Sequence, residues 1–307
     1  MNAAPHAVID APAEAAPAPA RTRPFYWSVR RELWENRSIY LAPLGVATFA
    51  VAGLVIHAIT MPSHMPGMLA VDDAATESAS ITYRVAALLM LATTFVIAAF
   101  YCLEALAGER RDRGILFWKS LPVSDLTTVL AKAVVPLVIL PLLAFAAIVA
   151  MHVVLLLLSA IALAMHGRGV GVLWSELRLF TMWASLLYSL VCIVLWHAPI
   201  YGFLLLVSGW ARRTAVLWAV LPLLALGVLE KLTFDSMNVA AFVQYRLLGW
   251  HVHAFDPRGP AITVPFHPST PLTPGRLLGT PDLWIGLVLA GVFIAAAVRM
   301  RRHREPI

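Results

Sequence analysis

The chain has little cysteine and little charge for its length. Cys102 and Cys192 are its two cysteines among 307 residues, and both lie inside apolar runs. Neither has a metal-ligating neighbour at a useful spacing, so we interpret both as small buried hydrophobic residues and exclude a disulfide framework. Charged residues make up 13% of the chain and apolar residues 60%. Soluble domains contain about 25% and 45–50% of these classes, so the composition indicates a polytopic membrane protein.

The sequence also lacks the common motifs for nucleotide and metal chemistry. It contains no Walker A loop, no GxGxxG, no HExxH, and no Ser/His/Asp set recognisable by spacing. The chain therefore has no visible means of binding and hydrolysing a nucleotide by itself. Its formal charge is +6, but the basic residues are scattered over short loops and tails, which argues against nucleic-acid binding. No row of charges follows one face of an apolar run, which argues against an ion-coupled transporter.

Six apolar runs predict an all-α integral membrane protein with six transmembrane helices, because about 20 residues cross the hydrocarbon core. The expected spans are 38–60, 85–107, 126–165, 179–207, 214–232 and 283–298. The segment 61–82 is polar, and the connection 234–282 is rich in Pro and His. The long third run has no room for a turn between two spans, so we expect one helix that is kinked at Pro136 and Pro141.

Lysine and arginine are distributed unevenly between the two sides that six spans define. One side holds 15 of them, contributed by the N-terminus, the loops 108–125 and 209–213, and the C-terminus. The other side holds 7, and Lys132 is left within the third run. Because basic residues favour the cytosolic side, we expect both termini in the cytosol, in what we take to be a bacterial inner membrane, and the connection 234–282 facing outward. The tail 301–307 is then cytosolic.

The N-terminal part divides into two segments. Residues 1–23 are rich in Ala and Pro, and we expect a disordered cytosolic tail. Residues 24–40 combine aromatic and charged residues at helical spacing, which predicts a helix lying in the membrane interface. An ordinary juxtamembrane segment is the alternative. The residues that carry the interfacial prediction are Phe25, Trp27, Arg30, Arg31 and Trp34.

Several isolated polar residues have open interpretations. His251, His253 and Asp256 lie close together in the connection 234–282, where they suit either a metal site or a polar loop whose histidines cap turns. His57, His152 and His197 lie in apolar runs, and we expect neutral imidazoles hydrogen-bonded to neighbouring helices. Glu104 is expected to pair with Arg110 or Lys132. Close helix packing is expected at small residues, namely Gly45, Gly53, Gly286 and Gly291.

The most informative segment is a short charged loop, 109–122, between the second and third runs. It begins with Glu109, Arg110, Arg111, Asp112 and Arg113 and ends at Pro122. Charge at a membrane edge is ordinary, but this loop also holds four consecutive bulky apolar residues, Ile115 to Trp118. Water is an unfavourable environment for them, so we expect the loop to dock on a soluble partner. A positive-inside loop without any partner is the alternative.

Residues 109–132 resemble the membrane subunits of ABC-2 type exporters. In that family an acidic and basic segment with a glycine precedes a short helix and a Leu-Pro-like turn, between the second and third spans. Residues 24–300 also match the family's layout, with an interfacial N-terminal helix, six spans, cytosolic ends and a large connection before the last span. Many members carry Gly-Thr where this chain has Gly114-Ile115.

The resemblance implies a permease subunit that has no cofactor of its own and is not an enzyme. A separate ABC ATPase would bind ATP and magnesium, and a second permease copy, identical or different, would complete a dimer. The charged loop would be the cytosolic coupling helix, anchored by its aromatic residues, while its arginines meet acidic groups of the ATPase. The implied coupling residues are Glu109, Arg110, Arg111, Arg113, Gly114, Leu116, Phe117, Trp118, Lys119, Leu121 and Pro122.

Two other classes of function also fit the spans. One is a membrane-embedded enzyme with its site at His251, His253 and Asp256. The other is a membrane anchor for a soluble complex, which would share the docking loop but transport nothing. The sequence does not specify a cargo.

Overall fold

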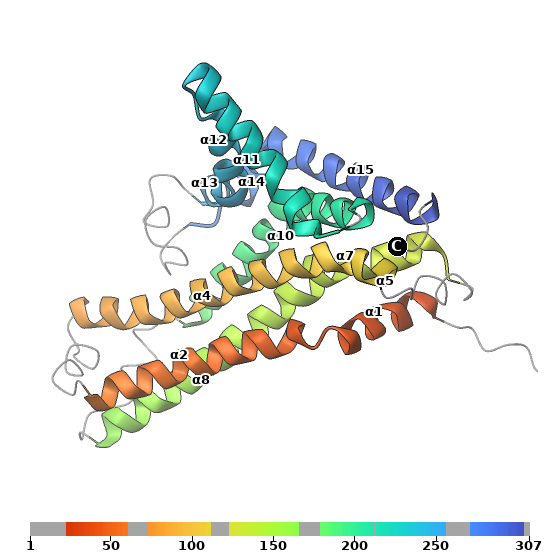
Figure 1. Cartoon of the computed structure of the whole chain (residues 1–307). Helices are drawn as coiled ribbons and strands as arrows, with labels where there is room; N and C mark the ends of the chain where they lie inside the picture. Colours follow the sequence, from red (N-terminus) through yellow and green to blue (C-terminus); the bar gives the residue numbers. More distant parts are fainter. Residues whose placement is uncertain are drawn as a thin grey trace, which may run out of the picture.

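The computed structural model of the chain describes residues 23–60, 73–111, 123–165, 179–211, 213–255 and 271–303. This described part is almost entirely helical (Figure 1). Its one extended contact is an isolated antiparallel bridge between Phe255 and Leu272. The tail 1–22, most of the charged loop (112–122), Asp256 and the last four residues lie outside the described ranges, so the expectations for them remain predictions.

The helices follow the order of the apolar runs. They are α1 (Pro24–Glu35), α2 (Ser38–Thr60), α4 (Asp73–Ala105), α5 (Ala107–Arg111), α7 (Asp125–Val134), the π-helical turn η1 (Val135–Ile139), α8 (Leu140–Met165), α10 (Leu179–Trp210), α11 (Ala215–Phe234), α12 (Asn238–Leu248), α13 (Trp250–Ala254), α14 (Pro274–Leu278) and α15 (Pro281–His303).

Five helical segments are long and apolar enough to cross a membrane. They are Tyr83–Arg111, Asp125–Ile161, Leu179–Trp210, Ala215–Phe234 and Pro281–His303. Helix α2 contributes an apolar segment, Ser38–Gly53, which is shorter than these five. The described chain therefore has the character of an integral membrane protein.

The third run forms one continuous helix, which confirms the prediction that it is not split. α7 passes into α8 through η1, where Pro136 lies and where the N–H of Leu140 donates to the carbonyl of Val135. Proline has no N–H and its ring clashes with the carbonyl four residues earlier, so a wider turn accommodates it without ending the helix. The second proline, Pro141, lies in the first turn of α8.

The second helix begins earlier than predicted. We expected a polar segment up to residue 82, but α4 already starts at Asp73. The reason is local: residues 73–105 contain neither Gly nor Pro, and their first turns are rich in Ala, so nothing stops the helix from extending beyond its apolar part.

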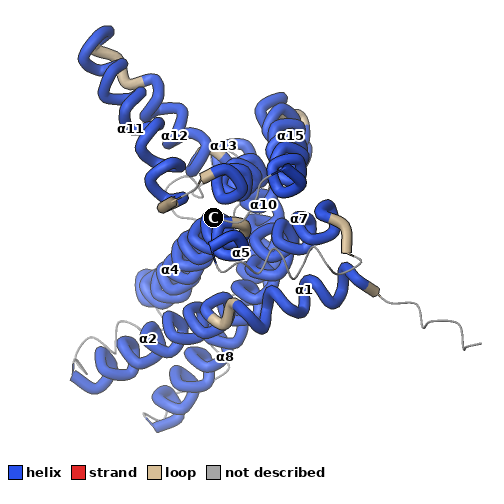
Figure 2. The backbone as a smooth tube through the Cα atoms, turned by 45° about the vertical axis from the view of Figure 1, so that its right-hand side comes forward, coloured by secondary structure: helices blue, strands red, loops and turns tan. Residues whose placement is uncertain are grey.

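Helix α10 lies at the centre of the molecule, packed most extensively against α15 and also against α4 and α8 (Figures 1 and 2). Glycine allows the closest of these approaches. A Cβ at Gly202 would lie 3.2 Å from the carbonyl oxygen of Ala290 on α15. The packing role expected of Gly45, Gly53 and Gly291 is wrong within the described chain, because a Cβ there would meet nothing within 4 Å. These three glycines point away from the helix contacts that the fold makes.

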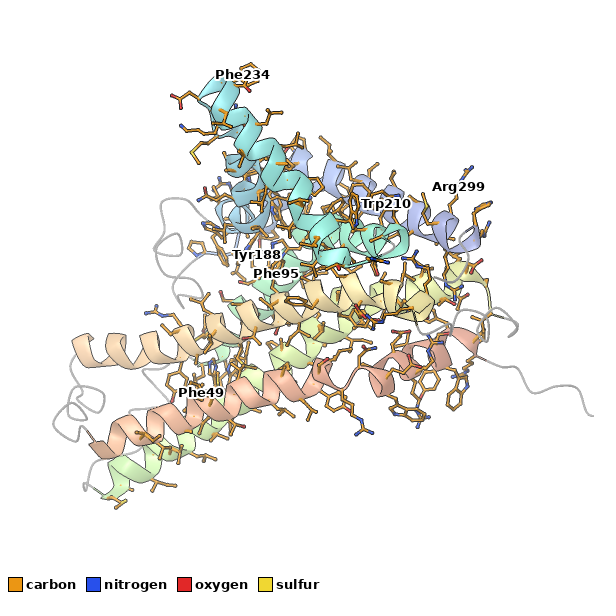
Figure 3. The ribbon with its side chains drawn as sticks, viewed as in Figure 1. Phe49, Phe95, Tyr188, Trp210, Phe234 and Arg299 are labelled. Atoms are coloured by element: carbon orange, nitrogen blue, oxygen red, sulfur yellow. The ribbon has the colours of Figure 1, made fainter. Side chains whose placement is uncertain are left out.

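Helices α11 and α12 form a hairpin that projects from the rest of the molecule, with Phe234 at its tip (Figures 2 and 3). Most side chains of α11 are exposed. The hairpin turn is fixed by Glu230, whose carboxylate accepts the N–H groups of Asn238 at 2.7 Å and Val239 at 2.8 Å. These are unpaired donors of the first turn of α12, and an anion at a helix N-terminus is favourable.

Candidate functional site at the base of the charged loop

A cluster of buried charges lies where the charged loop begins and ends. It gathers side chains from four helices, α1, α5, α7 and α15, whose ends meet on one side of the molecule (Figure 1). We call it the ionic cluster. Its members are Arg31, Glu32, Glu109, Asp125, Lys132 and Arg301.

Lys132 is the central cation of the ionic cluster. Its Nζ lies 2.8 Å from Oε1 of Glu32 and 3.2 Å from Oε1 of Glu109, and the side chain is only 3% exposed. α7 places it there because Ser124 caps the helix start, accepting the N–H of Thr127, and because the buried face of α7 includes Thr128 and Lys132. A lysine in an apolar run is thus buried with two carboxylates.

Arg31 joins the same two carboxylates from the opposite side. Its Nη2 lies 2.8 Å from Oε1 of Glu32 and 3.0 Å from Oε1 of Glu109. The second oxygen of Glu32 accepts the hydroxyl of Tyr101, on α4, at 2.8 Å. Each oxygen of this buried carboxylate therefore has a partner, as a buried charge requires.

Electrostatics keep Glu32 ionised. Burial alone would raise the pKa of this carboxyl, but the combined effect of Lys132 and Arg31 is larger, so its pKa lies below the usual value. The neighbouring Glu35 shows the opposite balance: burial is again the largest influence, and the pKa of this carboxyl is raised.

The C-terminal end of α15 completes the cluster. Arg301 forms an ion pair with Asp125 in the first turn of α7, and its Nη2 lies 3.5 Å from Oε2 of Glu109. Glu109, immediately before the undescribed part of the loop, thus contacts α1, α7 and α15 through Arg31, Lys132 and Arg301.

The next residue of the loop, Arg110, is also used inside the molecule. Its Nη2 donates to the carbonyls of Ser208 and Ala211, both at 2.6 Å, at the C-terminal end of α10. The hydroxyl oxygen of Ser208 in turn accepts the N–H groups of Leu106 and Ala107, at the break between α4 and α5. These contacts satisfy carbonyls and donors that helix ends leave unpaired.

The predicted coupling residues therefore separate into three groups. Glu109 and Arg110 make contacts inside the chain, Glu109 in the ionic cluster and Arg110, which is buried, at the end of α10. Arg111 is exposed and pairs with Glu104 at 2.6 Å, so the expected pairing of Glu104 with Arg110 or Lys132 is wrong. The remainder lie outside the described residues: Arg113, Gly114, Leu116, Phe117, Trp118, Lys119, Leu121 and Pro122.

The sequence contains a signal for the ionic cluster in the positions of two charged residues. Glu32 lies three residues after Val29 and one before Leu33, on the apolar side of α1, and Lys132 lies in an apolar run. Two opposite charges on faces that should be buried indicate a pair. Only the fold shows that these two meet.

Beside the cluster, α1 keeps its aromatic residues at the surface. Phe25, Tyr26, Trp27 and Trp34 are all exposed, while Glu32 of the same helix is buried. The helix therefore carries exposed aromatic side chains as well as a charged, buried contact with its neighbours.

The second candidate region, around His253, forms a hydrogen-bonded group in the described part of the chain. The hydroxyl of Tyr245 donates to Asp282 at 2.6 Å and lies 3.0 Å from Nε2 of His253. Nδ1 of His251 lies against the carbonyl of Leu248. No group of three or more metal-ligating side chains occurs in the described part of the chain, and Asp256 lies outside it.

Burial shifts the pKa of Tyr245 and of His253 in this region. It raises the pKa of Tyr245 to about 12, aided by the hydrogen bond to Asp282. Burial also lowers the pKa of His253, which stacks on Trp196. The guanidinium of Arg246 lies on the other side of this group, 4.9 Å from the Trp196 ring centre. Trp196, Tyr245, Arg246 and Asp282 carry no local sequence pattern that points to this group.

The two described histidines of the apolar runs are bound to neighbouring helices, as predicted. Nδ1 of His152 accepts the indole N–H of Trp183 at 3.1 Å, so its proton is on Nε2 and donates to the carbonyl of Tyr83. Nε2 of His197 donates to the carbonyl of Leu247 at 2.9 Å, which joins α10 to α12. The side chain of His57 lies outside the description.

Comparison with known proteins adds no relative. No protein-family model, curated protein or solved structure matches this chain. The resemblance of residues 109–132 to ABC-2 type exporters is thus an inference from that segment and from the order of the helices.

Proposed function

We propose that this chain is the permease subunit of an ABC-2 type exporter. It would move a cargo out across the membrane by alternating access, powered by a separate ATPase that binds ATP and magnesium. The chain would work as a dimer with a second permease copy. The helices α2, α4, α7–α8, α10, α11 and α15 would be its six spans, with α1 in the interface and both termini in the cytosol.

The observation that best supports this proposal is the position of Glu109 and Arg110. They form the first turn of the charged loop, and they are bound to α1, α7, α15 and α10 through the ionic cluster and the end of α10. A loop that only balanced membrane charge would need no such attachment. A loop that transmits force does, because a push on it must reach several helices at once.

The proposed mechanism uses this attachment as a lever. ATP-driven closure of two partner subunits would push the segment 112–122, with Phe117 and Trp118 as its apolar anchors. Glu109 and Arg110 would carry the displacement into the bundle. Buried, hydrogen-bonded charges suit this role, since they hold a fixed geometry and break only at considerable cost.

Co-purification tests the partner. The full chain is extracted from its native membrane in mild detergent and the proteins that accompany it are identified. We expect an ATPase, and we expect its loss when Phe117 and Trp118 are both replaced by Ala. The matched control is Phe49→Ala on α2, an aromatic side chain that is 77% exposed and belongs to a different segment of the chain (Figure 3).

Two results would contradict the proposal. If the chain purified alone from its native membrane, the proposed ATPase partner would be ruled out. If the Phe117→Ala, Trp118→Ala variant retained the ATPase and transported normally, these two residues would not couple the chain to the ATPase. A partner complex that binds through the loop but shows no transport would favour a membrane anchor instead.

A further inference from the structure

Arg30 on α1 has surroundings that differ from those of the adjacent Arg31. The guanidinium carbon of Arg30 lies 4.5 Å from the ring centre of Trp34 and 5.2 Å from that of Trp27. Both indoles are more than half exposed, whereas Arg30 between them is partly buried. The two rings hold the guanidinium in place by cation–π attraction.

Arg30 has no acidic partner in the described part of the chain. The adjacent Arg31, by contrast, contacts Glu32, Glu35 and Glu109. A fixed guanidinium without an anion is an incomplete ion pair. Its planar donors suit the oxygens of a phosphate or carboxylate.

A hollow of about 260 Å³ opens beside Arg30. Trp27 and Trp34 on α1 and Val123 and Thr128 at the start of α7 contribute to its lining. The hydroxyl of Thr128 donates to the carbonyl of Ser124, so it is not the free donor of this hollow. The exposed lining is mainly apolar, and two arginines reach it: Arg31, which is paired with Glu32, Glu35 and Glu109, and Arg30, the cation without an acidic partner in the described chain.

We propose that this hollow binds the phosphate headgroup of an anionic membrane lipid, with Arg30 as the cation. The exposed aromatic residues decide between a lipid and a protein carboxylate. Trp27 and Trp34, which flank Arg30, and the adjacent Phe25 and Tyr26 are all exposed, and exposed aromatic residues beside a cation are the composition of a membrane–water interface. A lipid satisfies both features, since its phosphate pairs with Arg30 while its glycerol and upper acyl carbons cover the rings.

This inference requires α1 to lie at the membrane surface, but not that the chain is an exporter. Its test therefore uses the purified full chain without any ATPase. The protein in detergent micelles is mixed with equal amounts of phosphatidylglycerol and phosphatidylcholine, and the lipids that stay bound are counted by native mass spectrometry. Inorganic phosphate is added in a separate arm.

We expect retention of phosphatidylglycerol over phosphatidylcholine, and a loss of this preference of about tenfold in Arg30→Gln, since one charge-assisted contact disappears. Trp34→Ala should weaken it as well, because the guanidinium is no longer held. The matched control is Arg37→Gln, an exposed arginine just after α1, which should retain the preference.

Three outcomes would overturn the inference. Equal losses in Arg30→Gln and Arg37→Gln would indicate diffuse charge attraction and no built site. Competition by inorganic phosphate without any lipid preference would indicate a general anion site. Absence of a lipid preference, together with Arg30-dependent binding of an added soluble acidic protein, would assign Arg30 to a protein interface.

Discussion

Lys132 on α7 donates to Glu32 on α1 across 2.8 Å, although the two residues are 100 positions apart. Both side chains are almost fully removed from solvent. The pair holds the N-terminal helix against the helix that follows the charged loop. The two ends of that loop and α1 are thereby parts of one rigid unit, and the predictions below test this unit and its surroundings.

Removal of Lys132 should destabilise the protein strongly. In Lys132→Met, Glu32 and Glu109 lose their central cation, and breaking a buried pair from one side costs about 3–5 kcal/mol. We expect the midpoint of thermal unfolding, followed by size-exclusion fluorescence in detergent, to fall by roughly 5–10 °C. Lys231→Met is the matched control, because the pair of Lys231 with Asp235 is exposed and should shift the midpoint little.

A second substitution checks that the loss is the pair and not the size of the side chain. Glu32→Gln in the Lys132→Met background removes the uncompensated carboxylate, so the double variant should lose less stability than the two single variants together. Strict additivity would mean that Glu32 and Lys132 do not interact.

Stability should fall on acidification because of Glu32. Its folded pKa is lower than its unfolded pKa, so the unfolded chain binds more protons at this carboxyl and the stabilisation decreases as the pH falls. The contribution is complete above the ordinary glutamate pKa of about 4.3 and is lost as the pH passes below it toward the folded value. Unfolding midpoints from neutral to acidic pH should show a flatter decline in Glu32→Gln than in the native chain.

Arg110 and its neighbour Arg111 should behave differently. Arg110→Gln leaves the carbonyls of Ser208 and Ala211 without their charged donor, which should lower the free energy of unfolding by about 1–3 kcal/mol. Arg111→Gln removes an exposed pair with Glu104 and should change it by less than about 1 kcal/mol. Equal effects in a chemical unfolding series would argue against the contact of α5 with the end of α10.

Two glycines of α15 provide a packing test on a single helix. A Cβ at Gly286 would lie too close to Nη2 of Arg246, so Gly286→Ala should push this guanidinium away from Trp196. We expect a lower unfolding midpoint in that variant. At Gly291 a Cβ meets nothing within 4 Å, and Gly291→Ala should be neutral or stabilising by about 0.5–1 kcal/mol, as alanine favours helix. A neutral Gly286→Ala would mean that Arg246 moves without loss.

The sequence alone determined the long apolar helices. Runs of apolar residues fix where helices form because backbone groups in an apolar medium must bond within their own segment, and the single helix through Pro136 followed from the absence of room for a turn. The sequence predicted the ends of these helices less accurately than their existence. α4 extends to Asp73 because polar residues without Gly or Pro continue a helix as readily as apolar ones do.

Tertiary structure decided which charges meet. Glu32, Glu109, Lys132 and Arg301 lie in four helices, and ion pairing depends on distance in space, which no local pattern encodes. For the same reason the hydroxyl of Tyr245 on α12 meets both His253 on α13 and Asp282 on α15. Helix formation depends on neighbours along the chain, whereas the ionic cluster at the base of the charged loop depends on how four helices pack together.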